Sequence, residues 1–305
     1  MEVAFSKSNI KKLLPNPVSV DLAERYVLSE EQHRFYQDNG FLVIKDLIDF
    51  ASLYNYKRRF MQMCNGLVET GSSTIVRERA LVEKGLKGED AINKISEVHY
   101  DEVFMTYTEH PKLLHVLSQL IGKDITVVNS MIINKPPGTG IHPPHQDLFY
   151  FPFRPADKII GAWTAIDNVT RDNGCLFVLP RSHKRNVLYP HGHLQGANKL
   201  YHGILEQTAY DESQFSHLEM SPGDTVFFHP LIIHGSGPNV SKNYRKCVTA
   251  HYANSECQYI DVSGTVQEGV AREVEAEAKR RGFSLSFQDT WRFKSKQVLG
   301  VRSNL

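Results

Sequence analysis

The chain has 305 residues, of which 41% are hydrophobic and 23% are charged, and its formal net charge is +1. This composition is ordinary for a globular protein with a sizeable core, and it lacks the basic excess of nucleic-acid-binding domains. The four cysteines have no CxxC spacing, which favours free thiols over a disulfide framework, and no apolar stretch reaches transmembrane length.

The first part of the chain carries helical signals. Helices are predicted over residues 30–39, 47–65 and 111–121. Ser29 is the predicted N-cap of the first helix, with Gln32 at the capping-box position. Gly40 is predicted to end that helix, and the apolar run 41–44 follows as a short buried strand. Residues 70–90 are rich in charge and poor in periodic apolar positions, so a loop is expected there.

From residue 125 onward the pattern changes to short β-rich runs between Pro, Gly and Asn clusters. These runs are ITVVNSMII, KIIGAWTAID, GCLFVLP, DTVFFHPLIIH and KCVTAHYA. Such a pattern favours a barrel or a sandwich. The segment TVQEGVAREVEAEAKRRG is predicted to be helical and to end at Gly282. We therefore expect one domain, 1–305, made of an N-terminal arm (1–27), a mainly helical flank (28–124), a β core (125–262) and a C-terminal helix and tail (263–305).

The segment HPPHQD contains the first candidate metal ligands. Residues i and i+2 of a strand point to the same face, so His145 and Asp147 can offer an imidazole and a carboxylate to one ion. His142 falls out of step with that face. An H-x-D tripeptide is common by chance, so the assignment depends on a third ligand. Two histidines and one carboxylate with open positions suit ferrous iron that also binds a co-substrate and oxygen.

The downstream histidines that could complete the set are His183, His191, His193, His202, His217, His229, His234 and His251. His234 is favoured because it is predicted to end the apolar β-run DTVFFHPLIIHGSG, where a polar residue needs a partner. The turn-rich segment 235–243 predicts a hairpin that would place Arg245 beside His234. An arginine fork binds carboxylate with two hydrogen bonds, as an enzyme that uses 2-oxoglutarate requires. His251 shares the even spacing of Arg245 and is a further candidate for the pocket, whereas His142, His183 and His229 are expected in loops or near the site.

Several blocks, in the same order, resemble the phytanoyl-CoA 2-hydroxylase family from about Leu28 to the C-terminus. They are HQDLFYFPFRP, AWTAID, NGCLFVLP, GDTVFFHPLIIHGSG and YIDVSGT. The resemblance implies an Fe(II)- and 2-oxoglutarate-dependent dioxygenase of peroxisomal fatty-acid α-oxidation. Its expected reaction hydroxylates C2 of a 3-methyl-branched fatty acyl-CoA with O2, and L-ascorbate keeps the iron reduced. The implied fold is mainly β with flanking helices, around a double-stranded β-helix (jelly-roll, cupin-like) core.

The resemblance also implies roles for individual residues. It places the iron on His145, Asp147 and His234, the same three that spacing and context favour. It places the distal carboxylate of 2-oxoglutarate on Arg245, with Ser236 beside it.

Three more residues match family contacts to the co-substrate, namely Trp163, Met131 and Lys94. Without the resemblance, Trp163 and Met131 fit core packing equally well, and Lys94 fits a solvated surface. The phosphates of coenzyme A predict a basic rim around the pocket. Candidates for this rim are Lys135, Arg154, Arg181, Lys184 and Arg185, and none of them is preferred.

Two other classes of protein fit the sequence less well, and the last residues resemble an address signal. A zinc hydrolase of the metallo-β-lactamase type would need H-x-H-x-D-H, which HPPHQD does not match. A non-catalytic or differently specific jelly-roll relative would tolerate loss of a ligand or of the arginine, and all four are present. The C-terminal residues Ser303-Asn304-Leu305 resemble the S-K-L address, so a peroxisomal location and recognition by the import receptor are expected.

Overall fold

The computed structural model describes residues 25–195 and 201–300. The expected arm therefore lies outside the described residues up to residue 24, as do Ser303, Asn304 and Leu305. The helices are α1 (Glu30–Asn39), α2 (Phe50–Cys64), α3 (Arg79–Glu83), α4 (Glu102–Thr108), α5 (Pro111–Ile121), α6 (Glu268–Arg280) and α7 (Phe287–Lys294). None of these helices is long and apolar enough to cross a membrane.

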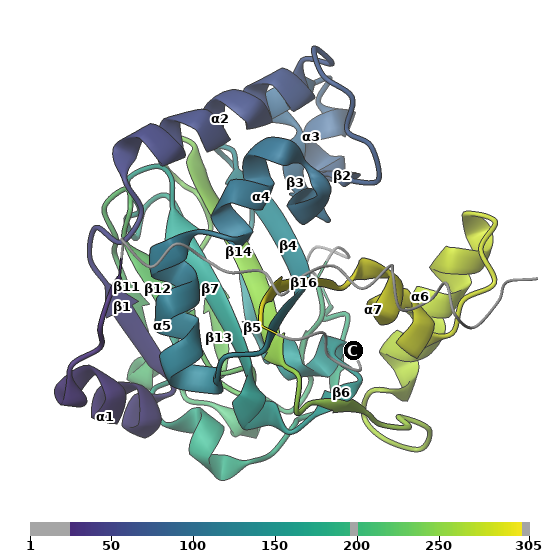
Figure 1. Cartoon of the computed structure of the whole chain (residues 1–305). Coiled ribbons are helices and arrows are strands. Elements are labelled where there is room, and N and C mark those ends of the chain that lie inside the picture. The colour runs from purple at the N-terminus through teal and green to yellow at the C-terminus, as the bar shows by residue number, and fades with distance from the viewer. Residues whose placement is uncertain (1–24, 196–200, 301–305) are drawn as a thin grey trace, which may run out of the picture.

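Two antiparallel sheets form the core (Figure 1). The larger sheet has the order β1-β12-β7-β14-β4-β3-β2, with β16 also paired to β4, and the smaller sheet has the order β11-β8-β13-β5. The strands of the larger sheet are β1 (Phe41–Ile44), β2 (Thr74–Arg77), β3 (Ile92–Ser96), β4 (Ile125–Lys135), β7 (Ile159–Ala165), β12 (Thr225–Phe228), β14 (Arg245–Asn254) and β16 (Lys296–Leu299). Those of the smaller sheet are β5 (His142–His145), β8 (Leu176–Val178), β11 (Ser216–Leu218) and β13 (His234–Ser236). The remaining short strands are β6 (Phe153–Arg154) with β15 (Gln258–Tyr259), and β9 (His191–Gly192) with β10 (Gly203–Ile204). The expected jelly-roll fold class is confirmed.

The residues of β14 alternate between the two faces of the larger sheet. Arg245, Thr249 and His251 line a cavity between the sheets, whereas Val248 and Tyr252 belong to the core cluster on the opposite face. That outer face is covered by α2, α4 and α5 (Figure 1). The helices therefore stabilise the sheet from outside, and its inner face is left for the cavity.

The C-terminal helices pack on aromatic residues beside the cavity. Trp291 of α7 contacts Phe151 edge-to-face, with ring centroids 5.1 Å apart, and both belong to one buried cluster. Gln267, at the N-terminal end of α6, donates hydrogen bonds from Nε2 to the carbonyls of Leu148, Phe149 and Phe151. The segment that follows Asp147 is thus held by the C-terminal part of the chain.

The local predictions in the first part of the chain hold for α1 and α5 and fail for residues 70–90. The capping box of Ser29 and Gln32 is formed, and Gly40 adopts the left-handed conformation that ends α1. The segment expected to be a loop instead contains β2 and α3. Both elements are short, and β2 is half-exposed at the edge of the sheet, so it shows no clear apolar alternation.

The hairpin expected between His234 and Arg245 is also wrong. The run DTVFFHPLIIH is not one strand, because β12 ends at Phe228 in the larger sheet and β13 begins at His234 in the smaller sheet. Arg245 begins β14, which pairs with β4 and β7 and not with β13. The chain therefore crosses between the sheets on both sides of β13. The two residues face the same cavity from opposite walls.

Candidate active site

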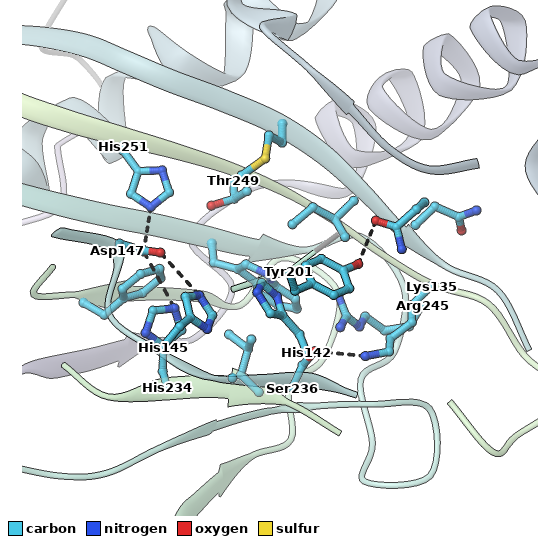
Figure 2. A pocket seen from close by; sticks show the side chains of 18 residues that line it. Lys135, His142, His145, Asp147, Tyr201, His234, Ser236, Arg245, Thr249 and His251 are labelled. Carbon is cyan, nitrogen blue, oxygen red and sulfur yellow. Dashed lines mark hydrogen bonds and ion pairs between the residues drawn. The ribbon is translucent and has the colours of Figure 1, made fainter. Parts of the chain in front are cut away.

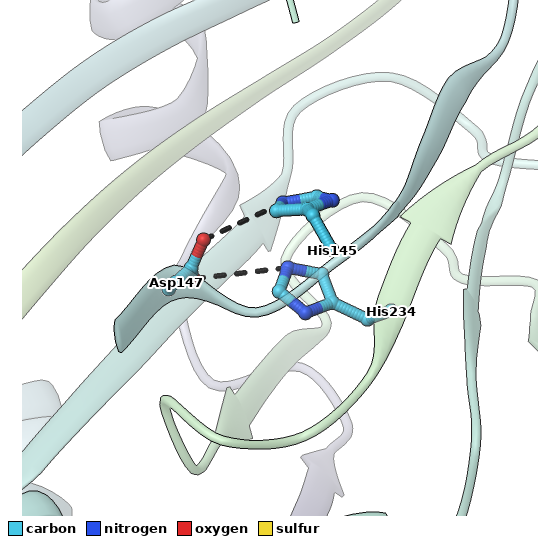
Figure 3. Close-up of side chains that lie close together, drawn as sticks. All are labelled: His145, Asp147 and His234. Carbon is cyan, nitrogen blue, oxygen red and sulfur yellow. Dashed lines mark ion pairs between the residues drawn. The ribbon is translucent and has the colours of Figure 1, made fainter. Parts of the chain in front are cut away.

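The pairing of two short strands brings the two histidines of the predicted iron triad together. His234 of β13 lies directly opposite His145 of β5, and their ring centroids are 4.2 Å apart. The spacing of His145 and Asp147 predicts both on one strand, and this is wrong for Asp147. β5 ends at His145, and Asp147 opens a 3-10 turn (Asp147–Tyr150). This turn still directs the carboxylate toward both imidazoles (Figure 3).

The donor atoms of these three residues are arranged as a metal site requires. Nδ1 of His145 lies 2.9 Å from the Pro143 carbonyl, and Nδ1 of His234 lies 3.1 Å from the Ile232 carbonyl. Both Nδ1 atoms must therefore donate a proton, which leaves each Nε2 with a free lone pair. Nε2 of His145 is 3.4 Å from Oδ1 of Asp147, and Nε2 of His234 is 3.7 Å from Oδ2. All donor atoms lie within 4.8 Å of one another, so one ion can reach all three.

Burial and neighbouring charge set the protonation states that an ion needs. Burial, together with His145, lowers the pKa of His234 to about 4, so its imidazole is neutral near pH 7. Burial alone would raise the pKa of Asp147, but His234 and His251 hold it well below its usual value. Nε2 of His251 lies 2.8 Å from Oδ2 of Asp147 and orients the carboxylate from the opposite sheet. The set is two imidazoles and one carboxylate, which fits ferrous iron with open positions.

A group of buried cations lies at the other end of the same cavity (Figure 2). Arg245 is 2% exposed and Lys135 is 4% exposed. Arg245 donates from one Nη to the Gly174 carbonyl at 2.9 Å, while its buried Nε has no hydrogen-bond partner in the described part of the chain. Nζ of Lys135 donates to Oγ of Ser236 at 3.0 Å. Among the described residues no carboxylate lies within 4.0 Å of either cation, so this end of the cavity is suited to an anion.

The other residues predicted to contact the co-substrate differ in their placement. Trp163 and Met131 line the cavity, and the Arg245 guanidinium lies 5.4 Å from the centre of the Trp163 ring. Lys94 does not line it. Lys94 is paired with Ile133 across β3 and β4, on the sheet face to which Met131 and Ile133 belong. Its pairing with Ile133 places it beside the cavity wall. Burial lowers the pKa of the cavity residue His142, and the charges of His145 and Lys94 lower it further.

Several residues of the cavity were not assigned from sequence. The spacing predicts that His142 lies off the face shared by His145 and Asp147. It instead stacks on His145, with ring centroids 4.1 Å apart, because the stretch HPPH does not alternate regularly. Tyr201 stacks on His142 at 4.0 Å and donates its hydroxyl proton to Asn93. Lys135, one of the candidates for the basic rim, lies inside the cavity. Lys135 follows Met131 and Ile133 along β4 at spacings of two residues, and this spacing indicates that all three side chains point to the same face of the sheet.

Most of the other basic-rim candidates make local contacts. Arg154 donates to the carbonyls of Phe151 and Phe153, Lys184 pairs with Asp38, and Arg185 donates to the Ala209 carbonyl. His183 and His229 also lie outside the residues that line the cavity, with His183 contacting the Gln37 carbonyl and His229 accepting from the Leu231 amide. Neither the basic candidates nor these histidines add a ligand to the site.

Comparison with known proteins shows the family to which the chain belongs. The family model for phytanoyl-CoA dioxygenase (PhyH) matches residues 36–247. The chain is 43% identical to "Phytanoyl-CoA dioxygenase, peroxisomal" of Rattus norvegicus, and 40% identical to the protein of that name in Homo sapiens. Each alignment covers 92% of this chain and 85% of the relative. "Probable phytanoyl-CoA dioxygenase" of Caenorhabditis elegans is 43% identical, and the alignment covers 92% of this chain and 96% of that relative.

Solved structures show the same fold at much lower identity. The apo form of EctD from S. alaskensis has a TM-score of 0.61 at 17% identity, with 80% of this chain and 85% of that one covered. The epimerase SnoN in complex with Fe3+, alpha ketoglutarate and nogalamycin RO has a TM-score of 0.58 at 17% identity, with 77% and 86% covered. These likenesses concern the fold alone. By its family match and by its identity to relatives of which 85% or more is covered, the chain belongs to the phytanoyl-CoA dioxygenase family.

Proposed function

We propose that this chain is an Fe(II)- and 2-oxoglutarate-dependent dioxygenase that hydroxylates C2 of a 3-methyl-branched fatty acyl-CoA, of the phytanoyl-CoA type. The observation that carries the proposal is one buried cavity with His145, Asp147 and His234 at one end and Arg245 at the other. Its membership of the phytanoyl-CoA dioxygenase family supports the substrate class and the use of O2.

In this proposal the three ligands hold the iron, which when bound supplies the chemistry that activates oxygen with 2-oxoglutarate. The carbonyls of Pro143 and Ile232 keep His145 and His234 in the tautomer that can coordinate. His251 fixes the orientation of Asp147 by its hydrogen bond. The protein thus contributes orientation and a cavity shielded from water, and the cofactor contributes the reactivity.

The cations at the far end are proposed to hold the distal carboxylate of 2-oxoglutarate. Arg245 offers its unpartnered Nε, and Lys135 and Ser236 offer donors beside it. Trp163 and Met131 would flank the carbon chain of the co-substrate, since both line the cavity. Lys94 is proposed as an electrostatic contributor from the wall, in keeping with its effect on His142. Desolvated cations bind a dicarboxylate more strongly than exposed ones, because no water screens the contact.

The cellular setting is part of the same proposal. Relatives named as peroxisomal support a peroxisomal location, with Ser303-Asn304-Leu305 as the segment read by the import receptor. L-Ascorbate would keep the iron ferrous between turnovers. We also propose that residues 28–124, 125–262 and 263–305 act as helical flank, jelly-roll core and C-terminal support of one domain. The packing of α2, α4 and α5 on the larger sheet supports a single domain. The flank and the C-terminal part also add β1, β2, β3 and β16 to that sheet.

A coupled assay tests the proposal. Purified protein with Fe(II), 2-oxoglutarate, ascorbate and O2 is expected to release one succinate for each 2-hydroxyacyl-CoA formed from a 3-methyl-branched acyl-CoA. A straight-chain acyl-CoA of equal length serves as the matched substrate and is expected to react more slowly. Asp147→Ala should abolish both products, and His217→Ala, an exposed histidine on β11, should retain them.

Two outcomes would overturn the proposal in different ways. Full succinate release by Asp147→Ala would show that the iron site lies elsewhere. A wild-type protein that binds 2-oxoglutarate with iron but yields no hydroxylated product from any acyl-CoA would be the differently specific or non-catalytic relative. A weak visible charge-transfer band under anaerobic conditions identifies that bound state independently of turnover.

A further inference from the structure

A second group of metal-binding side chains lies outside the cavity. His193 follows β9, His202 precedes β10, and Glu273 lies on α6. One donor atom from each lies within 4.8 Å of the others. Among the described residues, this group and the triad are the two sets that meet this criterion. The function proposed above makes no use of the second set.

The contact between His202 and Glu273 is unusual for a simple ion pair. Nε2 of His202 is buried and lies 3.0 Å from Oε2 of Glu273, but it has no hydrogen-bond partner among the described residues because the oxygen is off the direction of a ring N–H. Nδ1 of His202 lies 3.3 Å from the hydroxyl of Tyr150, and these two groups can hydrogen-bond with the ring in either tautomer. In the tautomer with the proton on Nδ1, the lone pair of Nε2 points past the carboxylate oxygen and meets no donor. A cation on the axis of that lone pair would also be within reach of Oε2 of Glu273, since ligands of one tetrahedral ion lie about 3.3 Å apart.

His193 supplies the third donor. Its ring stacks on that of His202, with centroids 4.4 Å apart and planes inclined by 26°. Nδ1 of His193 lies 3.3 Å from the Tyr201 carbonyl and must donate to it, so Nε2 is the atom that carries a free lone pair. His193 is exposed and the Glu273 side chain is 54% exposed, which leaves room for a water ligand.

We propose that His193, His202 and Glu273 form a second, peripheral site for a divalent transition ion, with Zn²⁺ as the best match. Two imidazole nitrogens, a carboxylate oxygen and water are a common ligand set for Zn²⁺. The site joins α6 to the segment that carries Tyr201, which lines the main cavity and stacks on His142. A bound ion would therefore fix Tyr201 against the cavity.

Metal stoichiometry tests this site without reference to turnover. Apo protein is saturated with Co²⁺, freed of excess ion on a desalting column, and its metal content is measured. The expected result is two ions per chain for the wild type, and one for His193→Ala and for Glu273→Gln. His33→Ala, which removes a half-exposed histidine on α1, is the matched control and should keep two. One ion in the wild type, or two in His193→Ala, would overturn the proposal.

Spectra and stability separate this site from the triad. The second Co²⁺ ion should give the strong visible bands of a four-coordinate site, and these bands should be absent from His193→Ala while the weaker signal of the triad persists. Added Zn²⁺ should raise the melting temperature of the iron-loaded wild type by at least about 2 °C and leave that of iron-loaded His193→Ala unchanged. Equal shifts in both proteins would contradict the proposal, whereas loss of hydroxylase activity alone would bear only on the function proposed for the triad.

Discussion

His251 donates from Nε2 to Oδ2 of Asp147 over 2.8 Å, and the two residues come from opposite walls of the cavity. Asp147 opens the turn after β5 of the smaller sheet, while His251 lies on β14 of the larger sheet. The contact therefore forms only when the two sheets face each other. It couples the orientation of a proposed iron ligand to the closure of the jelly roll.

Replacing His251 by leucine should weaken iron binding without unfolding the protein. The substitution removes the hydrogen bond that orients Asp147, and residues that orient metal ligands typically contribute 10–100-fold in metal affinity. We expect His251→Leu to raise the Kd for Fe(II) by about 10-fold or more, with activity partly restored by excess iron. His229→Leu is the control, since His229 is half-buried and lies outside the cavity lining. An unchanged Kd in His251→Leu would show that Asp147 is oriented by other contacts.

Replacing Lys135 by methionine should weaken the binding of 2-oxoglutarate. A charge-assisted hydrogen bond contributes about 1.5–3 kcal/mol, so the KM for 2-oxoglutarate should rise about 10–100-fold while kcat at saturation changes little. Lys184→Met, which removes a surface lysine paired with Asp38, should leave the KM as it is.

The pH dependence of the KM for 2-oxoglutarate is a second test of the role of Lys135. Burial and the charge of Arg245 hold the pKa of Lys135 well below its usual value, and a bound carboxylate would raise it again. Binding of the co-substrate thus takes up a proton, so affinity should fall as the pH rises above the pKa of the free enzyme. This decline should vanish in Lys135→Met. A decline of equal size in the variant would assign the proton to another group.

Gly174 should tolerate no side chain, because it shapes the pocket around Arg245. Its carbonyl accepts a hydrogen bond from Arg245, its φ is +89°, and a Cβ there would lie 2.7 Å from the Gly237 carbonyl oxygen. Gly174→Ala is expected to lower the free energy of unfolding by about 1–3 kcal/mol and to raise the KM for 2-oxoglutarate. Gly138→Ala is a matched control, with a φ of +83° and no atom within 4 Å of the added Cβ. It should show only the smaller cost in stability, and equal effects on KM would contradict the role of Gly174.

The sequence predicted those features that depend on short stretches of chain. The capping box at Ser29 and the strand-rich texture after residue 125 are local patterns, and both appear in the structure. The hairpin between His234 and Arg245 failed because a run of apolar residues does not reveal where a chain leaves one sheet for another. Family resemblance placed both residues at one site although the local reasoning about their connection was wrong.

Contacts between distant strands could not be read from the sequence. Even spacing from Arg245 indicated that His251 faces the cavity, which is where it lies, but its bond to Asp147 depends on the separation of the sheets. For Lys135 the sequence indicates only one of five candidates for a basic rim, because alternation along β4 gives the face of a residue but not its depth. Its burial follows from the facing sheet, where Ser236 meets its ammonium group.

Buried histidines should make the fold sensitive to mild acid, and His99 is the clearest case. His99 is fully buried between Ser130 and the Lys294 carbonyl at the end of α7, and burial lowers its pKa to about 4. The unfolded chain, with a histidine pKa of about 6.5, binds a proton that the folded chain excludes. Stability is therefore unaffected above about pH 6.5 and is lost as the pH falls toward 4, by about 2 kcal/mol at pH 5 from this residue. Urea unfolding at pH 7.5 and at pH 5 measures the loss of unfolding free energy between the two pH values. This loss should be smaller by about 2 kcal/mol in His99→Gln than in the wild type. In the control His33→Gln it should equal that of the wild type. Equal losses in His99→Gln and the wild type would show that other groups cause the acid sensitivity.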